Sequence, residues 1–176
     1  MKLKGHNCCW PNREGGVGTE NKRRVLLTGA TGMIGANLAR RLVADRYQVF
    51  ALLRRSSSRF RLQSVEKQLE ILYGDVTDPE SVETAVNQAR PDVVFHLAST
   101  PFNPPTISAE EHLQVNVLGT LYLLEALRKV PGVRTVFTGS TAVYGSGSKL
   151  REDQLPWPAT VLGASKACAG ILLQTF

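Results

Sequence analysis

The chain has 176 residues, of which 43% are hydrophobic and 20% are charged, and its formal net charge at pH 7 is +6. This length corresponds to about one domain with a substantial core, and the composition is typical of a soluble globular protein. No apolar run approaches the length of a membrane span, no signal-peptide pattern follows the first lysines, and three cysteines cannot form a disulfide framework. We therefore expect a cytoplasmic protein with no membrane partner.

The positive charge does not by itself predict nucleic-acid binding. The basic residues fall into separate clusters at 22–24, 40–41 and 54–61, without the basic-aromatic interleaving that stacks bases. We expect most of these residues to be solvated surface and no nucleic-acid partner.

Residues 1–22 contain glycines and polar residues without periodicity, and we expect them to form a disordered extension. From residue 23 onward, short apolar strands alternate with amphipathic helices, which is typical of βαβ units and a parallel sheet. One α/β domain is therefore predicted over 23–176. After a first strand at 25–27, further strands are predicted at 48–53, 69–73, 92–97 and 133–138. Helices are predicted at 33–45, from Pro79, and at about 109–129 and 160–176.

The stretch 28–35, with the sequence TGATGMIG, links the first strand to the first helix. Its glycines permit a sharp turn, close approach of a phosphate to the main chain and close packing of the helix on the strand. The exposed N–H groups and the dipole of the helix start favour an anion. We expect a cofactor pyrophosphate to bind here, at Gly29, Thr31, Gly32, Met33, Ile34 and Gly35.

The end of the second strand is expected to lie beside the adenosine ribose of a bound dinucleotide. An acidic residue usually binds the ribose 2′-hydroxyl about 20 residues after the glycines, but residues 46–65 contain none. Arg54, Arg55 and three serines follow the strand instead, and guanidinium and hydroxyl groups suit a 2′-phosphate. The sequence favours NADP(H) as the cofactor, and NAD(H) stays possible. The alternative interpretation of these arginines and serines is a basic loop that binds no ligand.

Two other residues could be taken for reactive groups. His96 ends a predicted buried strand, where a single histidine is more often a core residue than a ligand or base. Cys168 falls on an apolar face of the last helix, so we expect it to pack rather than act as a nucleophile. No Cys/His cluster has metal-ligand spacing, and no metal site is expected.

Five segments carry recognisable motifs: the glycine stretch, GDVTD at 74–78, HLA at 96–98, NVLGT at 116–120 and STAVYG at 140–145. Together they resemble the extended short-chain dehydrogenase/reductase family, which includes nucleotide-sugar epimerases, dehydratases and related ketone reductases. The resemblance covers residues 23–176 and implies a Rossmann-type doubly wound parallel sheet of order 3-2-1-4-5. It also makes a homodimer through the last two long helices plausible, with contacts at Leu172, Leu173 and Phe176.

The resemblance implies roles for residues at the matching positions. Asp75 would accept a hydrogen bond from the adenine amino group, and the Val76 backbone would contact the ring. Ala98 would line the cofactor near its nicotinamide end. Asn116 would order the helix and water around the active site, and Ser140 would hydrogen-bond the reacting oxygen.

One position departs from the family's catalytic pattern. Lys166 matches the lysine that binds the nicotinamide ribose and lowers the pKa of a tyrosine four residues earlier, but that earlier position is Leu162. Leucine has no proton to exchange, and losing a general acid or base costs roughly a hundred- to ten-thousandfold in rate. Tyr144 is a possible substitute, although the family gives that tyrosine a structural place.

Two further departures concern the reaction and the length. The Asp-Glu pair of the 4,6-dehydratase branch is replaced by Thr141 and Ala142, so dehydration is not expected. The family continues into a substrate lobe that is absent from these 176 residues, which indicates a fragment or a degenerate gene. The first hypothesis is an epimerase or reductase that acts by hydride transfer on a nucleotide sugar or related hydroxy/keto compound. The alternative is a dinucleotide-binding sensor or pseudoenzyme.

Overall fold

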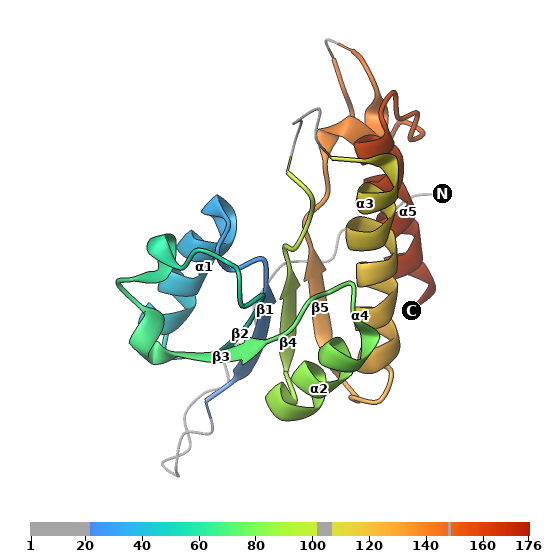
Figure 1. The fold of residues 1–176 in the computed structure, drawn as a ribbon. Helices are drawn as coiled ribbons and strands as arrows, with labels where there is room; N and C mark the ends of the chain where they lie inside the picture. The colour runs from blue at the N-terminus through green and yellow to red at the C-terminus, as the bar shows by residue number, and fades with distance from the viewer. Residues whose placement is uncertain (1–21, 102–106, 148) are drawn as a thin grey trace.

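The computed structural model describes residues 22–101, 107–147 and 149–176. The predicted disordered extension at 1–22 therefore lies, apart from Lys22, outside the described residues. Five parallel strands form one sheet in the order β3-β2-β1-β4-β5, which confirms the predicted α/β fold (Figure 1). The elements are β1 (Arg24–Thr28), α1 (Met33–Ala44), β2 (Gln48–Leu53), η1 (Phe60–Leu62), η2 (Glu66–Gln68), β3 (Leu69–Tyr73), α2 (Pro79–Ala89), β4 (Val93–His96), α3 (Ala109–Leu113), η3 (Gln114–Leu118), α4 (Gly119–Leu127), β5 (Arg134–Phe137), η4 (Thr141–Tyr144) and α5 (Val161–Thr175).

Apolar side chains on both faces of the sheet account for its two helical layers. In β1, Val25 and Leu27 belong to the core beneath α1, whereas Leu26 belongs to the core shared with α2 and α4. All three side chains are fully buried. Because successive side chains of a strand point to opposite faces, a strand that is apolar throughout must be covered on both sides. Figure 1 accordingly shows α1 on one face and α2, α4 and α5 on the other.

The chain reverses its direction across the sheet after β3. The strands β1, β2 and β3 follow one another outward, and α2 then returns the chain to β4, which pairs with the other side of β1. Thr28 and His96, the last residues of β1 and β4, are paired in the register. After β1 the chain enters the layer of α1, and after β4 it enters the opposite layer of helices. The carboxyl ends of these two strands therefore form a topological switch point, where open α/β sheets bind ligands.

The helix predicted at about 109–129 is divided into three parts. Helix α3 passes into the π-helical turn η3 and then into α4. The wider turn contains Asn116, which is almost completely buried, and π-bulges of this kind often occur at functional sites. Periodicity predicted one continuous helix because the apolar pattern does not reveal the extra residue that a π-helical turn contains.

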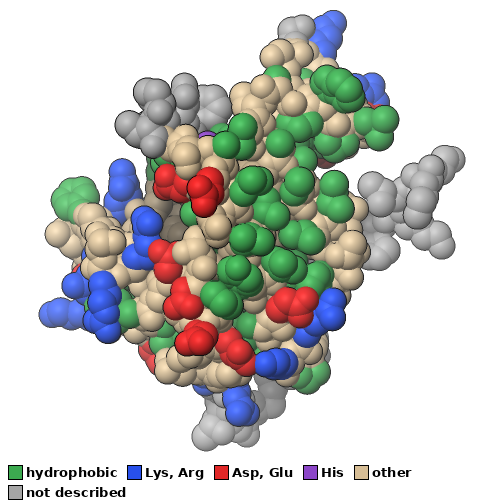
Figure 2. All heavy atoms as spheres, turned by 45° about the vertical axis from the view of Figure 1, so that its right-hand side comes forward, with side chains coloured by type: hydrophobic (Ala, Val, Ile, Leu, Met, Phe, Trp, Pro, Cys, Tyr) green, Lys and Arg blue, Asp and Glu red, His purple; other side chains and the backbone are tan. Residues whose placement is uncertain are grey.

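The prediction that Cys168 packs is wrong, because its side chain is exposed. The buried residues of α5 are Gly163, Ser165, Lys166 and Ala169, and Cys168 lies off that stripe. Figure 2 shows hydrophobic side chains gathered on the face formed by α4 and α5. Among the described residues, no helix combines the length and the hydropathy that crossing a membrane would need.

Candidate functional site

The amino-terminal end of α1 opens onto a cavity of about 250 Å³, whose lining includes Gly29, Thr31 and Gly32. Gly32 is the N-cap of α1 and makes no side-chain cap, whereas Asp78 caps α2 and Thr160 caps α5 with side-chain oxygens. The N–H groups in the first turn of a helix have no intrahelical acceptor, and the helix dipole makes that end positive. The uncapped start of α1 is thus suited to an anion.

Two glycines give this turn its shape. Gly29 has φ +71°, and a Cβ atom there would lie 2.6 Å from the carbonyl carbon of Leu97. A Cβ atom on Gly35 would lie 2.8 Å from the Cα atom of Ala30 and closer still to the Gly29 carbonyl oxygen. Both contacts involve main-chain atoms, which cannot move aside without moving the loop. The turn therefore requires glycine at both positions.

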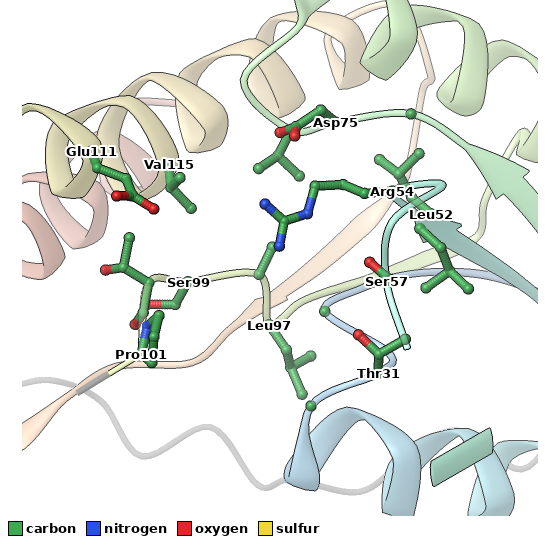
Figure 3. Close-up of a pocket in the computed structure, with 17 residues that line it drawn as sticks. Thr31, Leu52, Arg54, Ser57, Asp75, Leu97, Ser99, Pro101, Glu111 and Val115 are labelled. Carbon is green, nitrogen blue, oxygen red and sulfur yellow. The ribbon is translucent and has the colours of Figure 1, made fainter. Parts of the chain in front are cut away.

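The arginines that follow β2 point in different directions. The side chain of Arg54 extends from the end of β2 into the hollow, and Ser57 lies on the same wall (Figure 3). The guanidinium group of Arg55 instead packs over the ring of Tyr73, 4.6 Å from its centroid, and Arg55 is not among the residues that line the cavity. Met33 and Ile34 also leave their side chains in solvent, so these two positions offer only backbone groups to a ligand.

The remaining walls come from three parts of the chain. Asp75 and Val76, after β3, and Ala98, after β4, line the cavity; their cofactor contacts stay a prediction from the resemblance. The Asp75 carboxylate oxygen Oδ1 accepts hydrogen bonds from the backbone N–H and the hydroxyl of Thr77, at 3.0 and 2.9 Å. Sequence reasoning missed Thr100, Glu111 and Val115, which line the cavity as well. Figure 3 labels Glu111 and Val115. Glu111 and Val115 are four residues apart and precede Asn116, a spacing that could have indicated a cavity-facing helix side.

His96 is a buried structural residue, in agreement with the sequence. Its Nδ1 lies 2.7 Å from Thr28 Oγ1 and its Nε2 lies 3.1 Å from Thr120 Oγ1. The Thr120 hydroxyl donates to the backbone oxygen of Asn116, so it accepts from Nε2–H, and Nδ1 then accepts from Thr28. Thr28 Oγ1 in turn accepts the backbone N–H of Ala98 at 3.1 Å. His96 thus holds in place a residue of the cavity wall.

Asn116 holds the loop after β4 at Thr100, two residues beyond Ala98. Its Oδ1 accepts the backbone N–H of Thr100 at 3.0 Å, and its Nδ2 donates to Thr100 Oγ1 and to Ser165 Oγ. Side-chain bonds therefore tie η3 to the loop after β4 and to α5. All three side chains are buried, which makes these hydrogen bonds costly to break.

Acid should destabilise the folded chain through His96. Burial, together with the nearby charge of Lys166, lowers the pKa of His96 from 6.5 to about 3. Between these values the unfolded chain binds the extra proton, so the unfolding free energy should fall by up to about 1.4 kcal/mol per pH unit below pH 6.5. Urea unfolding at several pH values should show a flatter dependence for His96→Gln than for the parent. An equal pH dependence of the unfolding free energy in the parent and the variant would contradict the lowered pKa of His96.

A second cavity, of about 810 Å³, lies between η4 and α5. It brings together Ser140, Tyr144 and Lys166, whereas Leu162 is not among the residues that line it. Ser140 Oγ accepts the backbone N–H of Ala142 at 3.2 Å, so its own proton is available to a ligand. The hydroxyl of Tyr144 donates to the backbone oxygen of Glu152 at 3.4 Å.

Lys166 is the buried cation of this second cavity. Its Nζ lies 4.0 Å from the centroid of the Phe137 ring, and burial lowers its pKa from 10.5 to about 8. Lys166 lines the second cavity and not the first, so the two hollows hold different parts of the predicted site. Among the described residues, no group of three or more His, Cys, Asp or Glu residues is placed to hold a metal ion.

The model of the NAD dependent epimerase/dehydratase family matches residues 25–176. The chain belongs to this family. A UDP-glucose 4-epimerase of Mycolicibacterium smegmatis is 34% identical over 165 residues, which cover 87% of this chain and 51% of the relative. A dTDP-L-rhamnose 4-epimerase of Burkholderia thailandensis is 30% identical over 138 residues, which cover 74% of this chain and 38% of the relative.

Solved members of the epimerase/dehydratase family share the observed fold. The UDP-glucose 4-epimerase of Thermus thermophilus, in complex with NAD, superposes with a TM-score of 0.75 at 33% identity over 86% of this chain and 50% of that structure. The chain spans about a third to a half of the length of the curated relatives that it matches. The Thermus thermophilus complex does not support a preference for NADP(H), because the cofactor in it is NAD.

Proposed function

We propose that this chain is the nucleotide-binding part of an NADP(H)-preferring epimerase or reductase that acts by hydride transfer. The observation that carries the proposal is the uncapped start of α1 beside Gly29, open to a cavity at the switch point of the sheet. In such sheets the pyrophosphate of a dinucleotide lies on this helix end. Asp75 and Val76 would then contact the base, as the motif implies.

The preference for a 2′-phosphate is proposed from Arg54. Its guanidinium group lies in the cavity together with Ser57, and no carboxylate occurs at residues 46–65 to repel the phosphate. Planar guanidinium groups bind phosphates through paired charge-assisted hydrogen bonds. Arg55 would add only to the local positive potential, because its side chain is engaged with Tyr73.

The Arg54→Ala variant should lose the preference for NADPH. Hydrogen bonds to charged groups contribute about 1.5–3 kcal/mol, so NADPH should bind the variant roughly tenfold to a hundredfold more weakly, with NADH nearly unchanged. Calorimetric titration of both nucleotides measures the ratio, and Arg55→Ala is the matched control because it removes a guanidinium group outside the cavity. Tighter binding of NADH than NADPH by the parent would contradict the preference. Absence of heat with either nucleotide would contradict the function itself.

The chemistry would take place in the second cavity. A bound nicotinamide would supply the hydride donor or acceptor. The Ser140 hydroxyl would donate its free proton in a hydrogen bond to the reacting oxygen, and the Lys166 ammonium would bind a ribose hydroxyl. Asn116 would act through position, since its bonds hold the loop at Thr100 and helix α5. A nucleotide sugar or a similar hydroxy/keto compound is the proposed substrate, because the relatives named above act on such compounds.

The second candidate function is nucleotide binding without turnover. Leu162 favours it, because the residue one turn before Lys166 has no exchangeable proton. Tyr144, which lines the second cavity, donates its hydroxyl proton to a backbone oxygen. In both candidates a homodimer would form through α4 and α5, where Figure 2 shows hydrophobic side chains at the surface and where Ile171 and Phe176 are exposed.

A further inference from the structure

The amine of Lys166 lies in an apolar setting at the edge of an open cavity. The residue is only 5% exposed, and its Nζ faces the ring of Phe137. The cavity that it lines, of about 810 Å³, is large enough for a small organic ligand. The hydroxyl of Ser140 belongs to the same lining. A primary amine and a free hydroxyl therefore share one ligand-sized space.

This amine has no anionic partner in the part of the chain that the structure describes. Among the described residues, its Nζ contacts the Phe137 ring and acts electrostatically on His96, and it makes neither a hydrogen bond nor an ion pair. Every fully buried side-chain nitrogen or oxygen atom in the described ranges has a hydrogen-bond partner. The Lys166 Nζ atom, which has none, must therefore reach the cavity space.

An unpaired lysine in an apolar setting loses its proton more readily than a surface lysine. Burial lowers the pKa of Lys166 to about 8, so about a tenth of the amine is neutral at pH 7 and about half at pH 8. The neutral amine is a nucleophile toward carbonyl carbon, and desolvation is one of the ways in which proteins activate lysines for this reaction.

We propose that, in the nucleotide-free chain, Lys166 is a covalent binding site for small aldehydes and ketones. The Nζ lone pair attacks the carbonyl carbon, and the carbonyl π electrons move to the oxygen, which takes up a proton from the new ammonium. The hydroxyl then takes up a second proton and leaves as water while the nitrogen lone pair forms the C=N bond, and the resulting iminium releases its N–H proton to solvent. The overall change, amine plus carbonyl giving imine plus water, needs no oxidant or reductant.

Ser140 is placed to assist both steps. Its Oγ accepts the Ala142 backbone N–H, so its hydroxyl can relay the proton of the new ammonium to the carbonyl oxygen during attack and a solvent proton to the departing hydroxyl afterwards. The imine site shares Lys166 and Ser140 with the proposed hydride chemistry but does not rest on it. Nucleotide binding would oppose it, because in the proposed function Lys166 binds a ribose hydroxyl instead.

The test is reductive trapping of the free chain with glyceraldehyde and cyanoborohydride between pH 6 and pH 9, followed by peptide mass spectrometry. At pH 7 Lys166 should be labelled at least about tenfold faster than the exposed Lys67 in the same sample, with its rate half-maximal near pH 8. The Lys166→Arg variant should lose the label from this peptide and keep the Lys67 rate. Labelling of Lys166 no faster than that of Lys67 overturns the proposal.

A parallel trapping with NADPH present separates this inference from the proposed function. Protection of Lys166 supports both. Fast labelling that NADPH does not prevent supports the imine site but contradicts the ribose-binding role of Lys166. Slow labelling in a chain that binds NADPH by calorimetry overturns the imine site and leaves the proposed function standing.

Discussion

Turnover should rise about a hundred- to ten-thousandfold when Leu162 is replaced by tyrosine. That factor is the usual contribution of a positioned general acid or base, and residue 162 lies one helical turn before Lys166 on α5. The Lys166 ammonium would lower the pKa of the new phenol, because a nearby positive charge favours the phenolate. The measurement is the absorbance change of reduced nicotinamide with a panel of nucleotide sugars.

The control for this variant is Leu162→Phe, which adds the same ring without the hydroxyl. The chain spans only part of its relatives, so both variants and the parent are assayed alone and joined to the downstream half of a close relative. An equal rise with phenylalanine would mean that packing, and not proton transfer, limits the reaction. Ordinary turnover by the parent would refute this interpretation of Leu162 altogether.

Replacing Gly35 with alanine should weaken NADPH binding by about a hundredfold. The added Cβ atom would lie 2.8 Å from the Ala30 Cα atom, so the turn and the first N–H groups of α1 must move apart. Overpacking of this kind costs about 1–3 kcal/mol, and the displaced donors lose their charge-assisted bonds in addition. Calorimetry with NADPH gives the affinity, and urea unfolding gives the stability.

The matched control is Gly170→Ala on α5, where an added Cβ atom meets nothing within 4 Å. Alanine has the higher helix propensity, so this variant should keep its affinity and gain up to about 1 kcal/mol of stability. If Gly35→Ala binds NADPH as tightly as the parent does, then the turn is not the pyrophosphate site. Urea unfolding of Gly35→Ala and Gly170→Ala shows whether each variant is folded, and the NADPH affinity is measured by calorimetry on the folded variants.

The two arginines after β2 differ in how much of their position can be predicted from the sequence. The absence of acidic residues at 46–65 and the presence of Arg54 and Arg55 are visible in the sequence, and both suggested a phosphate site. Only Arg54 lines the cavity, because Tyr73 on the neighbouring strand β3 offers Arg55 an aromatic face. Strand pairing decides which aromatic ring lies beside which guanidinium group, and that pairing joins residues far apart in the chain.

The sequence by itself determined the parallel α/β sheet, its strand order through the family motifs, and the glycine turn that opens α1. These features depend on periodicity and on conformations permitted within a few consecutive residues, and such local information is written directly in the chain. The tertiary structure alone decided the π-helical turn around Asn116, the exposure of Cys168, the hydrogen-bond partners of His96, and the separation of Lys166 from the first cavity. Each of these depends on which distant segments meet, because burial and hydrogen bonding are set by neighbours in space and not by neighbours in sequence.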